Sequence, residues 1–202
     1  MRDTGGNAAG DPAGDARPDA PPAPPLTLAG LNGLGEDAFV AALGSAVERS
    51  PWVVRRAWRL RPFASRAALA DALAAVMRSA APDDQRRLLL AHPELAGTEA
   101  RARRMTDDSQ GEQARLGLLA LDAATLARLD DGNRRYRERF GFPFVIALRL
   151  QPSLAAVFAQ LDTRLGHDAE TERAAAIEQV CAVMRGRLTR LVADPQACDA
   201  RP

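Results

Sequence analysis

Residues 36–50, EDAFVAALGSAVERS, contain the pattern that decides the fold class. Their large apolar side chains recur at spacings of three and four residues and so share one face of a helix: Phe39, Val40, Leu43 and Val47. The same periodicity continues on both sides, from residue 26 to about residue 192. Strand-like stretches are absent from this region with one short exception. We therefore predict an all-α fold.

Helix-starting residues divide this region into separate helices. Pro51 and Pro82 suit the first position of a helix, and Ser65 suits an N-cap. Further helices are expected at residues 109–121, 123–140, 152–165 and 168–192, the first two separated by Asp122. The sequence predicts a compact single-domain bundle of about seven to nine helices.

One apolar stretch departs from the helical period. Residues 142–148, FPFVIAL, follow Gly141 and contain Pro143, which holds the chain extended at the start of the stretch. We predict a buried extended segment near 142–148. Its backbone N–H and C=O groups need partners, and two alternatives could supply them: a bound polar heterocycle, or neighbouring loops and water.

The ends of the chain differ in composition from the helical region. Residues 1–25 are rich in Pro, Gly, Ala and Asp and have almost no large apolar side chains, so we expect a disordered leader. Residues 26–193 are expected to form the helical domain, and residues 194–202 a short polar tail. A chain of 202 residues fits one such domain.

Composition also limits the class of partner. The 27 basic and 26 acidic residues nearly cancel, so no long-range field attracts nucleic acid or anionic lipid. No apolar run approaches the roughly 20 residues needed to span a bilayer, and the N-terminus lacks a secretory signal. Cys181 and Cys198 match neither a metal-ligand spacing nor a disulfide framework. We expect a cytoplasmic protein with no metal site and no nucleic-acid or membrane partner.

His92, in the sequence His92-Pro93-Glu94-Leu95, is the first candidate for chemistry. Pro93 ends the preceding helix, because the residue before a proline avoids helical dihedral angles. With an ordinary pKa near 6.5, a histidine held at such a corner can exchange protons around neutral pH. The alternative is a histidine that only caps the helix or packs in the core.

The second candidate is the segment Ser109-Gln110-Gly111-Glu112-Gln113. On a helix, Ser109, Glu112 and Gln113 share one face. A structural alternative is a capping box, in which Glu112 turns back onto the backbone of Ser109. In the functional alternative, the free N–H groups of a helix N-terminus bind an anion beside these side chains.

Taken together, five motifs resemble the decarboxylase family that acts on 2-oxo-4-hydroxy-4-carboxy-5-ureidoimidazoline (OHCU) and forms (S)-allantoin in urate degradation. In chain order they are Arg61-Pro62-Phe63, His92-Pro93-Glu94-Leu95-Ala96-Gly97, Ser109-x-x-Glu112-Gln113 leading to Gly117-Leu118, Asn133-x-x-Tyr136, and Phe140-Gly-Phe-Pro-Phe-Val-Ile-Ala. The resemblance covers residues 26–192. One small departure is Glu94, where the family often has Asp.

This resemblance implies a homodimer with one pocket per subunit for a small heterocyclic substrate, and no metal or organic cofactor. It assigns His92 as proton donor. From the chemistry of the substrate we expect Glu112 to accept a hydrogen bond from, or deprotonate, the C4 hydroxyl. Ser109 and Gln113 are expected to hold the ureido and ring amides. The implied substrate-binding residues are Pro93, Ser109, Gln110, Gly111, Glu112, Gln113, Phe144, Val145, Ile146, Ala147 and Leu148. Whether Arg149 also reaches the pocket stays open.

Two other functions compete with this assignment. A non-catalytic interaction module of the same fold could use Trp52, Val53 and Trp58 as its partner surface. A general acid-base isomerase or lyase could apply the same His92 and Glu112 to a different heterocycle.

Overall fold

The computed structural model describes residues 26–102 and 104–193, and within them it is helical without a strand. The all-α prediction is confirmed. Eight helices have seven or more residues, as expected, and the short α1 and α6 bring the total in the described ranges to ten. The helices are α1 Leu28–Gly33, α2 Glu36–Leu43, α3 Pro51–Trp58, α4 Arg66–Arg78, α5 Pro82–Leu90, α6 Thr98–Arg101, α7 Asp107–Arg115, α8 Ala123–Phe140, α9 Leu154–Arg164 and α10 Ala169–Leu191, with 3₁₀ turns η1 Gly44–Ala46 and η2 Leu148–Leu150. The expected leader at 1–25 and tail at 194–202 lie outside the described residues.

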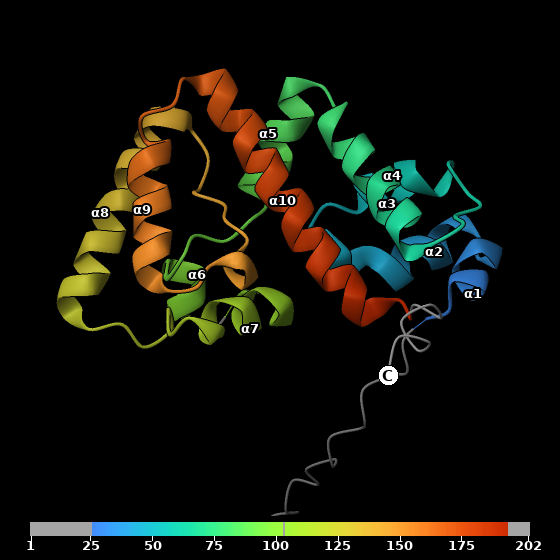
Figure 1. Cartoon of the computed structure of the whole chain (residues 1–202), viewed down its shortest axis with the longest axis horizontal. Helices are drawn as coiled ribbons and strands as arrows, with labels where there is room; N and C mark the ends of the chain where they lie inside the picture. Colours follow the sequence, from blue (N-terminus) through green and yellow to red (C-terminus); the bar gives the residue numbers. More distant parts are fainter. Residues whose placement is uncertain (1–25, 103, 194–202) are drawn as a thin grey trace, which may run out of the picture.

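The long helix α10 crosses the middle of the molecule (Figure 1). Helices α1 to α4 lie on one side of it, α8 and α9 on the other, and α6 and α7 below. Buried residues cover more than half of the circumference of α10, from Ala176 through Met184 to Leu188, while Glu178 and Thr189 on the remaining face are exposed. At the two ends of the domain, the Leu26 N–H donates to Leu191 O at 2.9 Å.

Several helix boundaries agree with the predictions. Ser65 caps α4 by accepting from the Ala68 N–H at 3.0 Å, and Asp122 caps α8 by accepting from the Thr125 N–H at 2.9 Å. Pro51 and Pro82 occupy the first turns of α3 and α5. The side chains at these positions fix the helix starts as local chemistry predicts.

Two predicted helices are wrong in extent. The helix expected over 36–50 ends at Leu43 and continues as η1, and Arg49 then takes a φ of 42° that a helix cannot contain. The helix expected over 109–121 begins at Asp107 and ends at Arg115. Its N-cap is Thr106, which accepts from the Ser109 N–H, so the capping box at Ser109 is wrong.

The extended segment is confirmed: residues 142–148 are all buried and have no regular structure before η2. Gly141 ends α8 in the left-handed region, at φ 74°. Side chains of the helices α7, α9 and α10 bind three of the backbone groups in the segment, where loops and water are the expected protein-side partners. Arg164 donates to Val145 O at 2.8 Å, Gln179 accepts from the Ala147 N–H at 3.0 Å, and Arg115 donates to Leu148 O.

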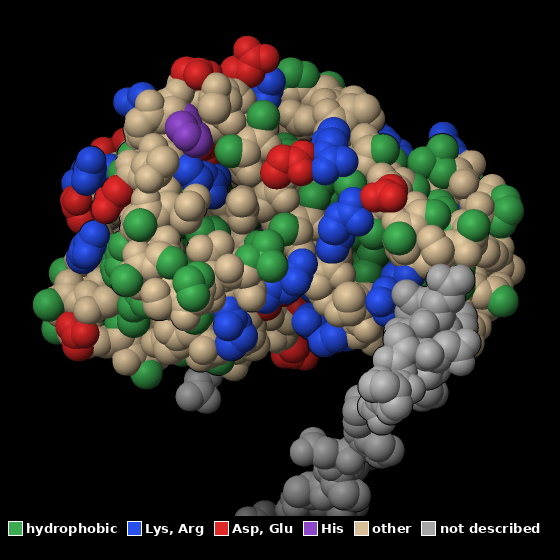
Figure 2. All heavy atoms as spheres, in the orientation of Figure 1, with side chains coloured by type: hydrophobic (Ala, Val, Ile, Leu, Met, Phe, Trp, Pro, Cys, Tyr) green, Lys and Arg blue, Asp and Glu red, His purple; other side chains and the backbone are tan. Residues whose placement is uncertain are grey.

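Figure 2 shows acidic and basic side chains together on the visible face, in keeping with the near-zero net charge. None of the helices in residues 26–102 and 104–193 is long and apolar enough to cross a membrane. Over the same described residues, no group of three or more His, Cys, Asp or Glu side chains could hold a metal ion.

Candidate functional site

His92 lies just beyond the C-terminus of α5, at the corner that Pro93 enforces. Its backbone N–H donates to Leu89 O at 3.1 Å, and its Nδ1 lies 2.9 Å from Leu88 O. Because a carbonyl oxygen can only accept, Nδ1 carries a hydrogen, and the neutral ring has an unprotonated Nε2. This Nε2 is buried and has no partner among the described residues. It is therefore the ring atom available to a bound molecule.

Burial determines the charge of His92. It is the main reason that the pKa of His92 is lowered to about 4, and the Leu88 hydrogen bond and the Glu48 charge oppose the shift only in part. The imidazole is therefore neutral at pH 7. Its Nε2 can accept a proton, and it must gain one before it can donate to a bound molecule.

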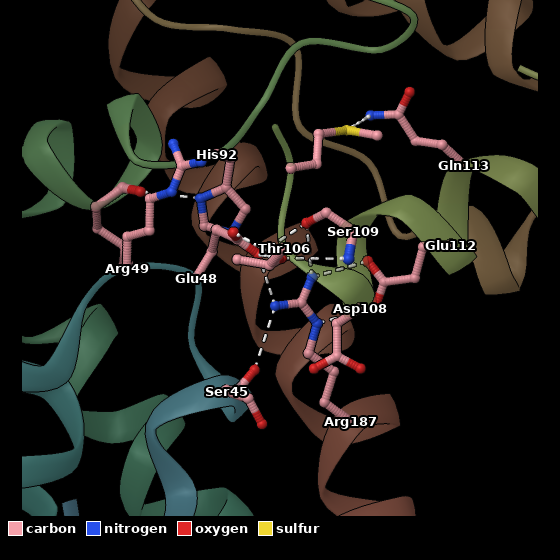
Figure 3. A network of polar contacts seen from close by, with 12 residues as sticks. Ser45, Glu48, Arg49, His92, Thr106, Asp108, Ser109, Glu112, Gln113 and Arg187 are labelled. Carbon is pink, nitrogen blue, oxygen red and sulfur yellow. Dashed lines mark hydrogen bonds and ion pairs between the residues drawn. The ribbon is translucent and has the colours of Figure 1, made fainter. Parts of the chain in front are cut away.

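A buried guanidinium, that of Arg187 on α10, organises the polar side of the site (Figure 3). Arg187 binds Glu112 with two contacts of 2.9 Å, from Nε and from Nη2, and binds Glu48 Oε2 through Nη1 at 2.8 Å. The Ser109 hydroxyl donates to Glu48 Oε2 at 2.7 Å and accepts from Arg187 Nη2 at 3.1 Å. Thr106 donates to the same Glu48 carboxylate at 2.9 Å.

The side chains of this network stabilise one another's charged forms. Burial favours the neutral form of Glu48, but hydrogen bonds from Arg187, Ser109 and Thr106 outweigh it and lower the pKa of Glu48. The two carboxylates raise the pKa of Arg187 above its ordinary value, although burial opposes the shift. One cation thus faces two carboxylates, and the network carries a net negative charge.

His92 and Glu112 line the same small cavity. Its volume is about 30 Å³, and its wall is formed by His92, Pro93, Leu95, Ser109, Glu112, Gln113, Phe144, Val145, Ile146, Leu148 and Val183. A cavity needs about 10–15 Å³ of this volume to hold one water molecule, so this one has room for water and is too small for a heterocycle. The cavity is partly open to solvent but small, so its walls must separate before a heterocycle can enter.

Comparison with known proteins identifies the family. The family model described as OHCU decarboxylase matches residues 32–189, most of the chain. The chain belongs to the OHCU decarboxylase family. It is 36% identical over 165 residues to 2-oxo-4-hydroxy-4-carboxy-5-ureidoimidazoline decarboxylase of Amia calva, covering 82% of this chain and 94% of the relative. The protein of the same name from Haloferax volcanii is 38% identical over 163 residues, covering 81% and 94% of the two chains.

Solved structures agree with this family. A crystal structure of (S)-allantoin synthase matches with a TM-score of 0.65 at 26% identity, covering 83% of this chain and 54% of that one. A crystal structure of OHCU decarboxylase in the presence of (S)-allantoin matches with a TM-score of 0.58, covering 78% and 98%. At 18% identity, the second likeness concerns the fold alone.

The structure brings most of the predicted site residues of this OHCU decarboxylase family member together. Three lie apart from the cavity wall. Gln110 lines a separate cavity of about 440 Å³ with Leu118 and Leu126, and Gly111 lines another of about 330 Å³ that also includes Arg149. Ala147 is buried and turns its N–H to Gln179. Arg149 thus faces a hollow that adjoins the site through Glu112, which lines both cavities.

Gln113 has a role that the sequence does not indicate. Its Oε1 accepts from the Ala96 N–H at 2.8 Å, and its Nε2 donates to Glu94 O at 3.1 Å. Both polar ends of the amide therefore hold the turn that follows His92. The side chain connects α7 to the turn that carries the imidazole.

Sequence reasoning missed Glu48 and Arg187. A signal for Arg187 exists, because it shares one face of the last helix with the apolar residues Val183 and Met184, where a lone guanidinium must find a buried partner. No comparable pattern marks Glu48, which follows Val47 at the end of an apolar face. The two residues meet from 139 positions apart, beyond the reach of a periodicity argument.

The partner surface suggested for a non-catalytic module is not a free surface. Val53 is fully buried in the core. Trp58 is half-buried, donates through Nε1 to Leu34 O at 3.2 Å and lies under the guanidinium of Arg61. Trp52 is also partly buried and packs against the core, so these three side chains do not form one free surface.

Proposed function

We propose that this chain decarboxylates OHCU to (S)-allantoin, a step of urate degradation, by using its own side chains without a cofactor. The observation that carries the proposal is that His92 and Glu112 line one cavity together with the apolar segment containing Phe144 and Val145. The family to which the chain belongs supports the same substrate.

The substrate contains its own electron acceptor. In OHCU the carboxylate is bonded to C4, next to a ring carbon-nitrogen double bond at C5. When CO2 leaves, the electron pair of the broken bond forms a C4–C5 double bond, and the imine electrons move to the ring nitrogen, which takes a proton from solvent. The C4 hydroxyl then loses its proton while C5 gains one, which yields the keto product. The protein must supply orientation and a proton acceptor and donor.

His92 and Glu112 divide this work. Glu112 accepts a hydrogen bond from the C4 hydroxyl, and its two contacts with Arg187 fix the carboxylate. After CO2 leaves, the hydroxyl turns from Glu112 to neutral His92, whose Nε2 takes the proton and returns it to one face of C5, which sets the S configuration. This assignment makes His92 an acceptor first and a donor second. The Leu88 hydrogen bond keeps the ring oriented in both protonation states.

The remaining wall residues fix the ring. Phe144, Val145, Ile146 and Leu148 offer an apolar surface to one face of the heterocycle, and Pro93 limits the cavity next to His92. The Ile146 N–H donates to no other described residue and is free to bind a ring carbonyl. Ser109 is expected to contact the substrate while it stays bonded to Glu48.

We also propose which part of the chain is active, how the chains assemble and where the enzyme acts. We expect residues 26–193 to carry the activity, two chains to form a homodimer, and the protein to act in the cytoplasm on a small molecule, with no nucleic-acid or membrane partner. Size-exclusion chromatography with light scattering tests the dimer. Turnover after exhaustive treatment with chelator tests independence from metal.

Freshly generated OHCU provides the test of the activity. OHCU decays spontaneously to racemic allantoin, so circular dichroism of the product is the informative signal. The account predicts faster decay and a product that is almost entirely the S enantiomer. An unchanged decay rate with racemic product would overturn the proposal.

A further inference from the structure

A second buried charged cluster lies beside the cavity and takes no part in the chemistry above. It consists of Arg164 at the end of α9, Glu172 in α10, Tyr136 in α8 and His167 in the α9–α10 turn. The side chains of Arg164 and Glu172 are 4% and 0% exposed, so the pair is almost completely removed from water.

The contacts within this Arg164 cluster are dense. Arg164 binds Glu172 Oε1 through Nε at 2.9 Å and through Nη2 at 2.5 Å. The Tyr136 hydroxyl donates to the same oxygen and accepts from Arg164 Nη2 at 3.2 Å. His167 Nδ1 lies 2.8 Å from the other oxygen of Glu172. These contacts fix the position of the guanidinium.

One arm of Arg164 leaves the cluster and reaches the cavity wall. Its Nη1 donates to Val145 O at 2.8 Å, and its guanidinium carbon lies 4.6 Å from the centre of the Phe144 ring. Val145 and Phe144 both line the cavity that contains His92 and Glu112. A single buried side chain thus holds the backbone of one wall residue and the ring of the other.

A wall of this kind needs such an anchor. Residues 143–147 have no helix or strand hydrogen bonds to fix them. They must nevertheless hold the substrate in its position relative to His92 with a precision of a fraction of an ångström. Stability alone does not require a buried ion pair, since apolar replacements of such pairs are often neutral or stabilising. We therefore assign Arg164 the role of fixing the positions of Val145 and Phe144 in the cavity wall.

We propose that Arg164 is a positioning residue for the reaction: it holds Phe144 and Val145 so that the heterocycle presents one face of C5 to His92. The inference rests on the proposed function. The two sides of the cavity are then held by different residues: Arg187 and its carboxylate partners fix the polar side, and Arg164 fixes the apolar side.

Arg164→Lys is the direct test, with Tyr136→Phe as its matched control. Lysine retains the charge and can pair with Glu172, but it lacks the second arm that binds Val145 O. Phenylalanine removes a buried hydroxyl from the same cluster and leaves both arms of Arg164 in place. For Arg164→Lys we expect kcat/KM to fall about 10- to 100-fold, the loss typical of small misplacements, and the enantiomeric excess of the product to drop. Tyr136→Phe should stay within threefold of wild type in both.

A second variant covers the case in which Arg164→Lys does not fold. Arg164→Met with Glu172→Met and Tyr136→Phe replaces the ion pair and the hydroxyl bonded to it by apolar groups, an exchange that is often neutral for stability, but it leaves Val145 O without its donor. Amide hydrogen exchange should become at least fivefold faster at residues 144–147 in either Arg164 variant and stay unchanged in Tyr136→Phe.

The outcomes are distinguishable. If wild-type protein fails to accelerate OHCU decay, the proposed function is wrong, while the exchange rates at 144–147 still test whether Arg164 holds the wall. If folded Arg164 variants keep wild-type kcat/KM and enantiomeric excess, or unchanged exchange at 144–147, the positioning role is wrong.

Discussion

Replacing Arg187 by methionine removes the one cation between two carboxylates. Glu48 would keep its burial, 0% side-chain exposure, and lose its charged partner. Breaking a buried ion pair in this way costs about 3–5 kcal/mol, because an uncompensated charge stays in the interior. For a chain of this size each 1 kcal/mol lowers Tm by about 2–4 °C, so we expect a fall of roughly 6–20 °C.

A double variant identifies the cause. Glu48→Gln in the Arg187→Met background removes the uncompensated charge and keeps an acceptor for Ser109 and Thr106, so it should restore part of the lost stability. Arg78→Met is the matched control, since it breaks an exposed pair with Glu178, with side chains 49% and 52% exposed. We expect about 0–1 kcal/mol there.

The assay is urea and thermal unfolding at several pH values. In the wild-type protein, folding lowers the pKa of Glu48. Its contribution to the free energy of unfolding is therefore fully present above the pKa of the unfolded state, and it is lost as the pH falls through the pKa of the folded state. Without Arg187, burial raises the pKa of Glu48, so acid neutralises it and the deficit of Arg187→Met shrinks. If Arg187→Met costs no more than Arg78→Met, or if Glu48→Gln gives no rescue, the reasoning is refuted.

Two further predictions concern the chemistry. Glu112→Gln should lower kcat by about 10²-fold or more, while Arg187 stays paired with Glu48. Glu112→Asp keeps the charge and should lose less. Equal losses in the two variants, measured by the optical activity of the product, would show that the charge does not matter. Because the pKa of His92 is about 4, NMR titration of the free protein should show a neutral ring from pH 8 to pH 6 that gains its proton only near pH 4; a midpoint near 6.5 would contradict burial as the controlling factor.

The sequence predicts those parts of the fold that local chemistry decides. Asp122 and Gly141 bracket α8, and its predicted range agrees with the observed Ala123–Phe140. The start of α7 could not be chosen in the same way, because Ser109 and Glu112 imitate a capping box while Thr106 is the true cap.

Less of the site than of the fold can be predicted from the sequence. His92, Pro93 and the segment containing Phe144 can be named from their motifs, and the structure places them around one cavity. The pairing of Glu48 with Arg187 depends on how α10 crosses the domain, which no local pattern encodes. The neutral state of His92 depends on burial by the finished fold, so an ordinary histidine pKa was the wrong starting point.

The central claim is that one imidazole moves the proton that fixes the chirality at C5. His92→Asn tests it most directly, because the amide can still donate to Leu88 O but cannot carry a proton between two atoms of the substrate. Freshly generated OHCU, followed by circular dichroism, should show a kcat reduced by about 10²- to 10⁴-fold and a racemic product. A variant that turns over within threefold of wild type and still forms (S)-allantoin would contradict the account.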